Sequence, residues 1–139
     1  MAHYAVLDSS NIVTGVLTGR DEDDATWPEG YSSWEDYYSQ KICGGATVVR
    51  TSYNTQNGEH QAGGSAFRGN FACQGMIYDS VKDKFYEPSP YPSWVLNETT
   101  WNWDPPIDYP SDYNSVSYEW DEVAYQADSS DPKTAGWVS

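Results

Sequence analysis

The segment YPSWVLNETTWNWDPPIDYP, residues 91–110, holds three tryptophans, two tyrosines and four prolines, and it has no basic residue. An apolar start at Val95 leads through an amide and acidic turn to an aromatic return at Trp103, and prolines stand on both sides. Proline cannot donate a hydrogen bond to a sheet and keeps φ at about −65°. The segment therefore predicts a β-hairpin held between two stiff, extended links.

The same pattern occurs on either side of this segment. Residues 77–92, IYDSVKDKFYEPSPYP, and residues 117–132, SYEWDEVAYQADSSDP, each run from apolar or aromatic residues through an acidic turn to aromatic residues. The number of residues between the turn residue and the aromatic residue that follows it is similar in all three segments, although it is not constant. We therefore expect a degenerate repeat of hairpin-plus-proline-link units over residues 76–126.

Further strands are expected in the N-terminal part. Residues 3–17 place apolar residues on both sides of Asp8–Asn11, four residues that bend readily, which predicts another hairpin. Because two strands alone are only marginally stable, this hairpin is expected to join a larger sheet. The β-branched residues of 46–55 predict one more strand, and the polar, Gly-rich segment 56–70 predicts an excursion loop.

One helix is predicted, near residues 33–43. Ser32 followed three residues later by Glu35 fits a capping box, and Lys41 suits the helix end. Three apolar residues at four-residue spacing predict the buried stripe, which should face the sheet: Trp34, Tyr38 and Ile42.

These elements predict a mainly β fold, at the margin of α+β, with antiparallel hairpins in one sheet or a small sandwich and a single short helix. A chain of 139 residues suits one domain, which we expect over residues 1–126. The tail at 127–139 is polar except for Trp137 and Val138. We expect it to become ordered only on a neighbouring protein or on the chain's own sheet.

Composition limits the classes of partner. Seven Lys and Arg stand against 21 Asp and Glu, which gives a formal net charge of −14. This charge repels phosphate backbones and anionic lipids, so neither nucleic acid nor a membrane is expected as a partner. No apolar stretch predicts a signal peptide or a spanning helix. Aromatic residues make up 16 % of the chain, so the core is expected to contain Trp and Tyr rings.

The sequence shows no catalytic constellation. His3 and His60 are its only histidines, and neither belongs to a nucleophile, metalloprotease or phosphate-binding motif. The acidic run 21–24 lacks the ligand spacing of a calcium loop. Cys43 and Cys73 lack the partners of a zinc site, and they can be free thiols or a disulfide. We therefore expect no enzyme, no metal and no cofactor, although a hydrolytic pair among the 21 acids stays an open alternative.

The aromatic residues are the candidate functional residues. Exposed rings beside acidic and amide groups suit either protein docking or sugar binding. Trp101 and Trp103, two residues apart, are expected on the same face of a strand, and a chain poor in Leu, Ile and Val needs such rings for structure or docking. The predicted partner-docking residues are Trp94, Trp101, Trp103, Tyr91, Tyr109, Phe67 and Arg68.

Five short motifs carry a resemblance to a known family. They are TSYNT at 51–55, FRGNFA at 67–72, YPSWVLNE at 91–98, WDPP at 103–106 and YEWDE at 118–122. Together, over about residues 3–125, they resemble a family of small virion proteins of marine tailed bacteriophages, including cyanophages. The acidic SSWEDYY segment and the tail after Asp128 depart from the family pattern.

The resemblance implies a non-enzymatic structural protein located in the virion, assembled in the host cytoplasm. The expected partners are other virion proteins, either the major capsid protein or tail proteins. We favour a capsid decoration or cement protein that docks through its aromatic-proline segments. A tail- or fibre-attached accessory protein and a carbohydrate-binding module for host attachment are the alternatives. A host glycan and a second copy of the chain stay open as further partners.

Overall fold

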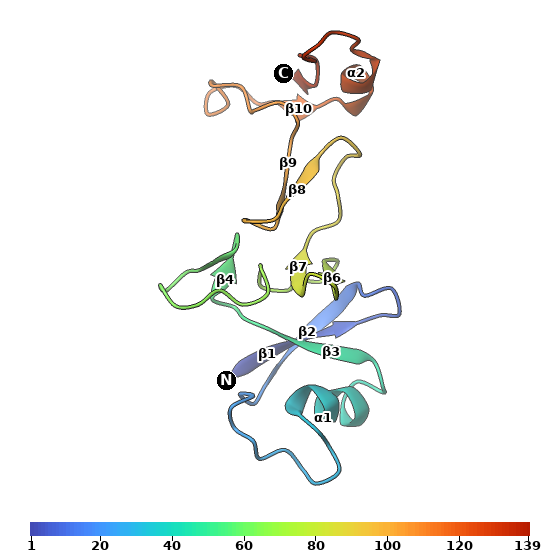
Figure 1. The fold of residues 1–139 in the computed structure, drawn as a ribbon, viewed down its shortest axis with the longest axis vertical. Helices are drawn as coiled ribbons and strands as arrows, with labels where there is room; N and C mark the ends of the chain where they lie inside the picture. The colour runs from blue at the N-terminus through green and yellow to red at the C-terminus, as the bar shows by residue number, and fades with distance from the viewer. The chain divides into compact units, whose positions relative to one another are not determined.

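The computed structural model describes all 139 residues, of which 28 % are in strands and 10 % in helices (Figure 1). The strands form antiparallel hairpins in small sheets, which confirms the predicted mainly β class. The chain divides into two compact units. Unit 1 comprises residues 1–88 and 98–102, and unit 2 comprises residues 89–97 and 103–139. The single domain expected over residues 1–126 therefore spans parts of both units, and the predicted tail is part of unit 2.

A three-stranded sheet forms the centre of unit 1. Strand β1 (Ala2–Leu7) pairs antiparallel with both β2 (Val13–Gly19) and β3 (Thr47–Thr51), so the order is β2-β1-β3. The turn of the predicted N-terminal hairpin is closed by Asp8, whose Oδ1 accepts the backbone N–H groups of Ser10 and Ile12. The predicted hairpin and its third strand are therefore both present.

Helix α1 (Trp34–Lys41) lies where the sequence predicted a helix, but its cap differs from the prediction. The N-cap is Ser33, whose Oγ accepts the N–H of Asp36 at 3.0 Å, and Asp36 in turn accepts the N–H of Ser32 at 2.9 Å. The capping pair is thus one residue later than Ser32 and Glu35. Glu35 instead accepts the N–H of Arg50 on β3.

The buried face of α1 is shorter than predicted. Trp34 is buried, and Tyr38 stacks on it with 5.6 Å between ring centroids. Ile42 is 62 % exposed because it is the C-cap residue, where the chain turns away through Gly44 at φ 61°. The predicted stripe therefore ends at Tyr38, whose hydroxyl accepts the N–H of Arg20.

The two faces of the central sheet are covered by different elements (Figure 1). The face toward α1 has a buried cluster of Ala2, Tyr4, Trp34 and Val48. The opposite face has a buried cluster of Ala5, Leu7, Val13, Val49, Ala72 and Phe85. Phe85 comes from the hairpin formed by β6 (Ile77–Asp79) and β7 (Lys84–Tyr86), so this hairpin closes the second face.

The segment 56–70, predicted as a loop, begins with a short hairpin. Strands β4 (Thr55–Gln56) and β5 (Glu59–His60) are joined by Asn57 at φ 54° and Gly58 at φ 75°. An Asn-Gly pair with both φ values positive is the preferred two-residue hairpin connection. The prediction of a loop alone was wrong here because it overlooked this dipeptide.

Two of the three predicted repeat units are hairpins. They are β6–β7 and the pair β8 (Val95–Asn97) with β9 (Asn102–Asp104). Their turns match: Asp83 and Trp101 occupy equivalent positions, each just before the return strand, at φ 56° and φ 58°.

The third predicted unit is not a hairpin. After the two-residue strand β10 (Glu119–Trp120), the Asp121 side chain accepts the N–H of Ala124 and caps a six-residue helix, α2 (Glu122–Ala127). Strand β10 pairs instead with β11 (Trp137–Val138), at the end of the predicted tail. Neither helix of the chain has the length and apolar character that a membrane crossing needs.

Candidate docking site

The core of unit 2 consists of aromatic rings around Trp120. Trp120 is 7 % exposed and is the one large buried side chain of this unit. Its ring centroid lies 5.1 Å from that of Trp137, 5.4 Å from that of Tyr125 and 6.0 Å from that of Trp94. Edge-to-face and tilted ring pairs of this kind are favourable beyond the area they bury. We call these four residues the ring cluster.

The β10–β11 pair brings the two central rings together. Trp120 and Trp137 are directly opposite each other in this pair. Gly136, at φ 150°, precedes Trp137, and a Cβ atom at this position would collide with the Trp120 ring. The close approach of backbone and indole therefore requires glycine at residue 136.

A row of rings leads from the ring cluster to solvent. Tyr109 lies 4.4 Å from Trp137 between centroids, and Tyr113 lies 6.2 Å from Tyr109. The indole N–H of Trp137 donates to the carbonyl oxygen of Ile107 at 2.9 Å, which fixes the segment that carries Tyr109. Tyr109 is 52 % exposed and Tyr113 is 58 % exposed. We call Tyr109 and Tyr113 the tyrosine pair: two half-exposed rings on a fixed base.

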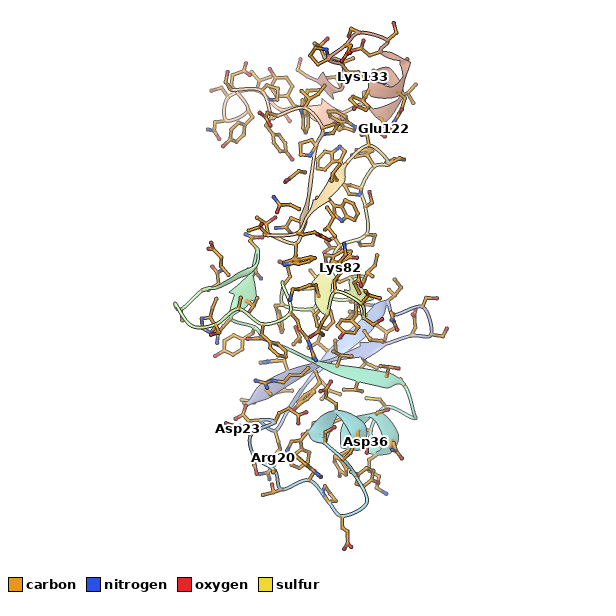
Figure 2. All side chains as sticks on the ribbon, viewed as in Figure 1. Arg20, Asp23, Asp36, Lys82, Glu122 and Lys133 are labelled. Atoms are coloured by element: carbon orange, nitrogen blue, oxygen red, sulfur yellow. The ribbon has the colours of Figure 1, made fainter.

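Glu122, which is labelled in Figure 2, joins the segment of Ser93, strand β10 and helix α2 through its carboxylate. The carboxylate accepts the N–H of Ser93 at 2.8 Å, the hydroxyl of Ser93 at 2.6 Å and the indole N–H of Trp120 at 3.0 Å. Desolvation acts to raise the pKa of Glu122, but the hydrogen bonds from Ser93, Trp120 and Gln126 outweigh it and hold the pKa at about 2. The ionised carboxylate is therefore the form that the folded unit stabilises.

Acid is expected to destabilise unit 2 through Glu122. Its folded-state pKa lies below the ordinary value of 4.5, so its contribution to stability is present above about pH 4.5 and is lost as the pH falls toward 2. Glu122→Gln should be less stable than the wild type at pH 7 and should lose part of the acid sensitivity. Tryptophan fluorescence during titration measures both effects. Glu119→Gln, at an exposed position in β10, is the matched control, and an unchanged acid transition in Glu122→Gln would contradict the assignment.

The predicted tail is held together by Asp128, and it is tied to the rest of unit 2 by Lys133 and by strand β11. Asp128 accepts the N–H groups of Thr134 and Ala135 at 2.8 and 2.9 Å. Lys133 donates to the carbonyl oxygen of Tyr125 at 3.0 Å, and its Nζ lies 4.7 Å from the centre of the Tyr125 ring. The tail thus folds on the chain's own strand β10 rather than extending freely.

Three of the predicted docking residues lie in unit 1 and make internal contacts. The Arg68 guanidinium pairs with Asp83 at 2.8 Å and lies 4.7 Å from the centre of the Phe67 ring. Trp101 stacks on Tyr86 at 6.4 Å between centroids with an 18° angle. Each of these residues therefore has a structural contact within unit 1, and a docking role for them stays a prediction.

The expectation that Trp101 and Trp103 share a strand face was wrong. Trp101 occupies the turn before β9 at φ 58°, and only Trp103 belongs to the strand. The turn position of Trp101 is fixed by Asn70, whose side-chain amide donates to the Trp101 carbonyl oxygen at 3.0 Å. The two tryptophans consequently belong to different units.

The other four predicted docking residues, Tyr91, Trp94, Trp103 and Tyr109, lie in unit 2. The Tyr91 and Trp94 rings are 5.6 Å apart, so Tyr91 extends the ring cluster. Trp103 is half-buried in β9. Among these four, Tyr109 has the greatest exposure.

Sequence reasoning missed the residues that make the base of the site. Trp120 and Trp137 were not singled out, because the pairing of β10 with β11 depends on the intervening helix and turn. Tyr113 was also missed, although its spacing of four residues from Tyr109 is a usable signal.

The titratable residues do not gather into a metal site. No group of three or more His, Cys, Asp or Glu side chains in the chain could hold a metal ion. Cys43 and Cys73 are both free thiols, Cys43 half-buried and Cys73 exposed.

No family model, curated protein or solved structure matches this chain. The assignment of function therefore depends on the residues and on the geometry described above.

Proposed function

We propose that this chain is a non-enzymatic structural protein of a tailed-phage virion, and that it docks on another virion protein through unit 2. The observation that carries the docking part is the tyrosine pair, two exposed rings held by a buried ring cluster. The phage assignment is supported by the sequence motifs that resemble marine phage virion proteins. A capsid decoration or cement protein is the placement that we favour.

The tyrosine pair has the physical properties of an interface anchor. Aromatic residues at the centre of an interface supply much of its binding energy when a partner excludes water from them. Tyr109 is packed against Trp137, so binding costs little additional side-chain entropy. A tyrosine also keeps a hydroxyl for a hydrogen bond at the edge of the contact.

The charge of the chain indicates the character of the partner surface. Asp108 and Asp112 are exposed and flank Tyr109 in the sequence, and the whole chain has a net charge of −14. Opposite charges across an interface steer association and suppress wrong partners. We therefore propose that the partner surface offers Lys or Arg side chains around a pocket for the rings.

Replacing the tyrosine pair is expected to remove the chain from the particle. The double variant Tyr109→Ala, Tyr113→Ala should reduce incorporation into virions by about tenfold or more. Truncation of an interface anchor commonly costs about 2 kcal/mol or more of binding free energy, which corresponds to an affinity loss of about thirtyfold. The copy number per particle, measured by quantitative mass spectrometry, is the readout. Tyr53→Ala is the matched control, because Tyr53 is a 60 % exposed tyrosine of unit 1.

Normal incorporation of a folded Tyr109→Ala, Tyr113→Ala variant would overturn the docking proposal. Placement on the capsid rather than on the tail or a fibre is tested separately, by locating the chain in intact particles by electron microscopy. The second candidate, a carbohydrate-binding module, is favoured by the same exposed rings beside acidic side chains. A glycan array with wild-type protein and the double variant distinguishes the two.

A further inference from the structure

A hollow of about 340 Å³ lies in unit 1, within the size range of small-ligand sites. The start of β1, the end of β3, strand β5 and the loop before Phe67 form its walls. Both histidines of the chain line it, together with an arginine and two aromatic rings: His3, His60, Arg50, Tyr53 and Phe67. It therefore combines donors, a cation and apolar ring surface.

Arg50 supplies a cation that makes no ion pair, although the Glu35 carboxylate accepts the Arg50 backbone N–H at 3.1 Å and pairs with Arg68 at 3.9 Å. The Arg50 guanidinium lies 5.0 Å from the centre of the Phe67 ring and has a buried Nε without a hydrogen-bond partner. Arg68 lies over the same ring, yet it pairs with Asp83 at 2.8 Å. In a chain where acids outnumber bases 21 to 7, a half-buried arginine without an ion pair is unusual.

The acidic group in the lining does not neutralise Arg50. Asp21 is the one carboxylate of the hollow, and it pairs with the amine of Met1 at 2.8 Å. The lining thus presents one cation whose usual partner, a planar carboxylate, is missing. Arginine binds such a group through two parallel hydrogen bonds.

The remaining lining suits a polar ring rather than a bare anion. His60 Nδ1 accepts the N–H groups of Ala62 and Gly64 at 3.1 and 3.0 Å, so its Nε2 is the donor nitrogen. Tyr53 is 60 % exposed, and its ring is fixed edge-to-face on His3 at 5.3 Å. Ser52, Asn54 and Ser65 add hydroxyl and amide groups.

We propose that this hollow binds a sugar that carries a carboxylate, such as a uronic acid residue, through the local charge of Arg50, whereas the net charge of −14 disfavours long polyanions. The carboxylate pairs with Arg50, the sugar ring packs on Tyr53, and the sugar hydroxyls bond to His60 and Asn54. A glutamate or aspartate of a peptide would use the guanidinium but not the exposed ring and the hydroxyl groups. This site lies in unit 1 and does not depend on the docking function proposed for unit 2.

The test is titration calorimetry of the full chain with a galacturonic acid trimer, a neutral galactose trimer and a triglutamate peptide. The acidic trimer is expected to bind at least about tenfold more tightly than the neutral trimer, since the charged pair is lost in the latter. Arg50→Gln should weaken binding of the acidic trimer by about tenfold or more, and Tyr53→Ala should weaken both trimers. Arg20→Gln, at an exposed arginine of the same unit, is the matched control.

Three outcomes would overturn the proposal. The first is that the acidic trimer does not bind at a concentration of about 10 mM, because affinity weaker than this is negligible. The second is equal binding of the two trimers, and the third is tighter binding of triglutamate. Arg50→Lys keeps the charge and should keep weaker binding, so it replaces Arg50→Gln if that variant fails to fold. The double variant of the tyrosine pair should bind the acidic trimer normally, which separates this site from unit 2.

Discussion

Replacing Phe85 by alanine is expected to destabilise unit 1 by about 3–5 kcal/mol, an amount that can exceed half the stability of a small domain. Phe85 is completely buried in the cluster that closes the sheet face opposite α1. Its ring also packs on Tyr78 at 4.9 Å between centroids. The substitution would remove the one buried side chain that the β6–β7 hairpin contributes to this cluster.

Urea denaturation followed by far-ultraviolet circular dichroism measures this effect. The matched control is Val81→Ala in the turn of the same hairpin, because Val81 is 93 % exposed and its truncation should change stability by less than about 0.5 kcal/mol. If Phe85→Ala and Val81→Ala unfold at the same urea concentration, the hairpin does not contribute to the core as described.

Replacing Trp120 by alanine is expected to abolish the folded state of unit 2. Truncation of a buried tryptophan costs about 3–5 kcal/mol. Trp120 contacts the other three rings of the ring cluster and donates a hydrogen bond to Glu122. Unit 2 has no second large buried side chain that could compensate for its loss. The variant should lose the part of the near-ultraviolet dichroism that the fixed rings of the ring cluster produce, while the part from Trp34 in unit 1 remains.

Tyr113→Ala is the control for Trp120→Ala, since the outer ring of the tyrosine pair is 58 % exposed and contacts only Tyr109 among the rings. It should fold with nearly wild-type stability. A Trp120→Ala protein with unchanged near-ultraviolet dichroism and an unchanged melting temperature would show that the ring cluster is not the core of unit 2.

The local elements of the fold could be predicted where one turn or one cap determines them. The N-terminal hairpin depends on Asp8 and its own neighbours, and the two later hairpins depend on turns of the same length. The α1 cap shows the limit of this reasoning. Two adjacent serines and two adjacent acids fit the capping pattern in two registers. Glu35 does not take part in the cap because its carboxylate accepts the N–H of Arg50, which is distant in the sequence.

The candidate site was less accessible to sequence reasoning. An aspartate that accepts an N–H three residues later suits both a turn and a helix start, so Asp121 was interpreted as a turn residue although it caps α2. Without α2, nothing in the sequence brings Trp137 opposite Trp120. Tyr109 was identified because it belongs to the proline-rich segment itself. Arg50 was missed because its place over the Phe67 ring, without an ion pair, is a property of the folded chain.

The assignment of residues 98–102 to unit 1 determines how the chain can be divided. A polypeptide that stops at Pro88 would deprive the Asn70 amide of the Trp101 carbonyl oxygen. One that starts at Trp103 would deprive Glu122 of both hydrogen bonds from Ser93. The chain therefore cannot be cut at one point without breaking hydrogen bonds within a unit. Two fragments that each contain one whole unit must both include residues 89–102.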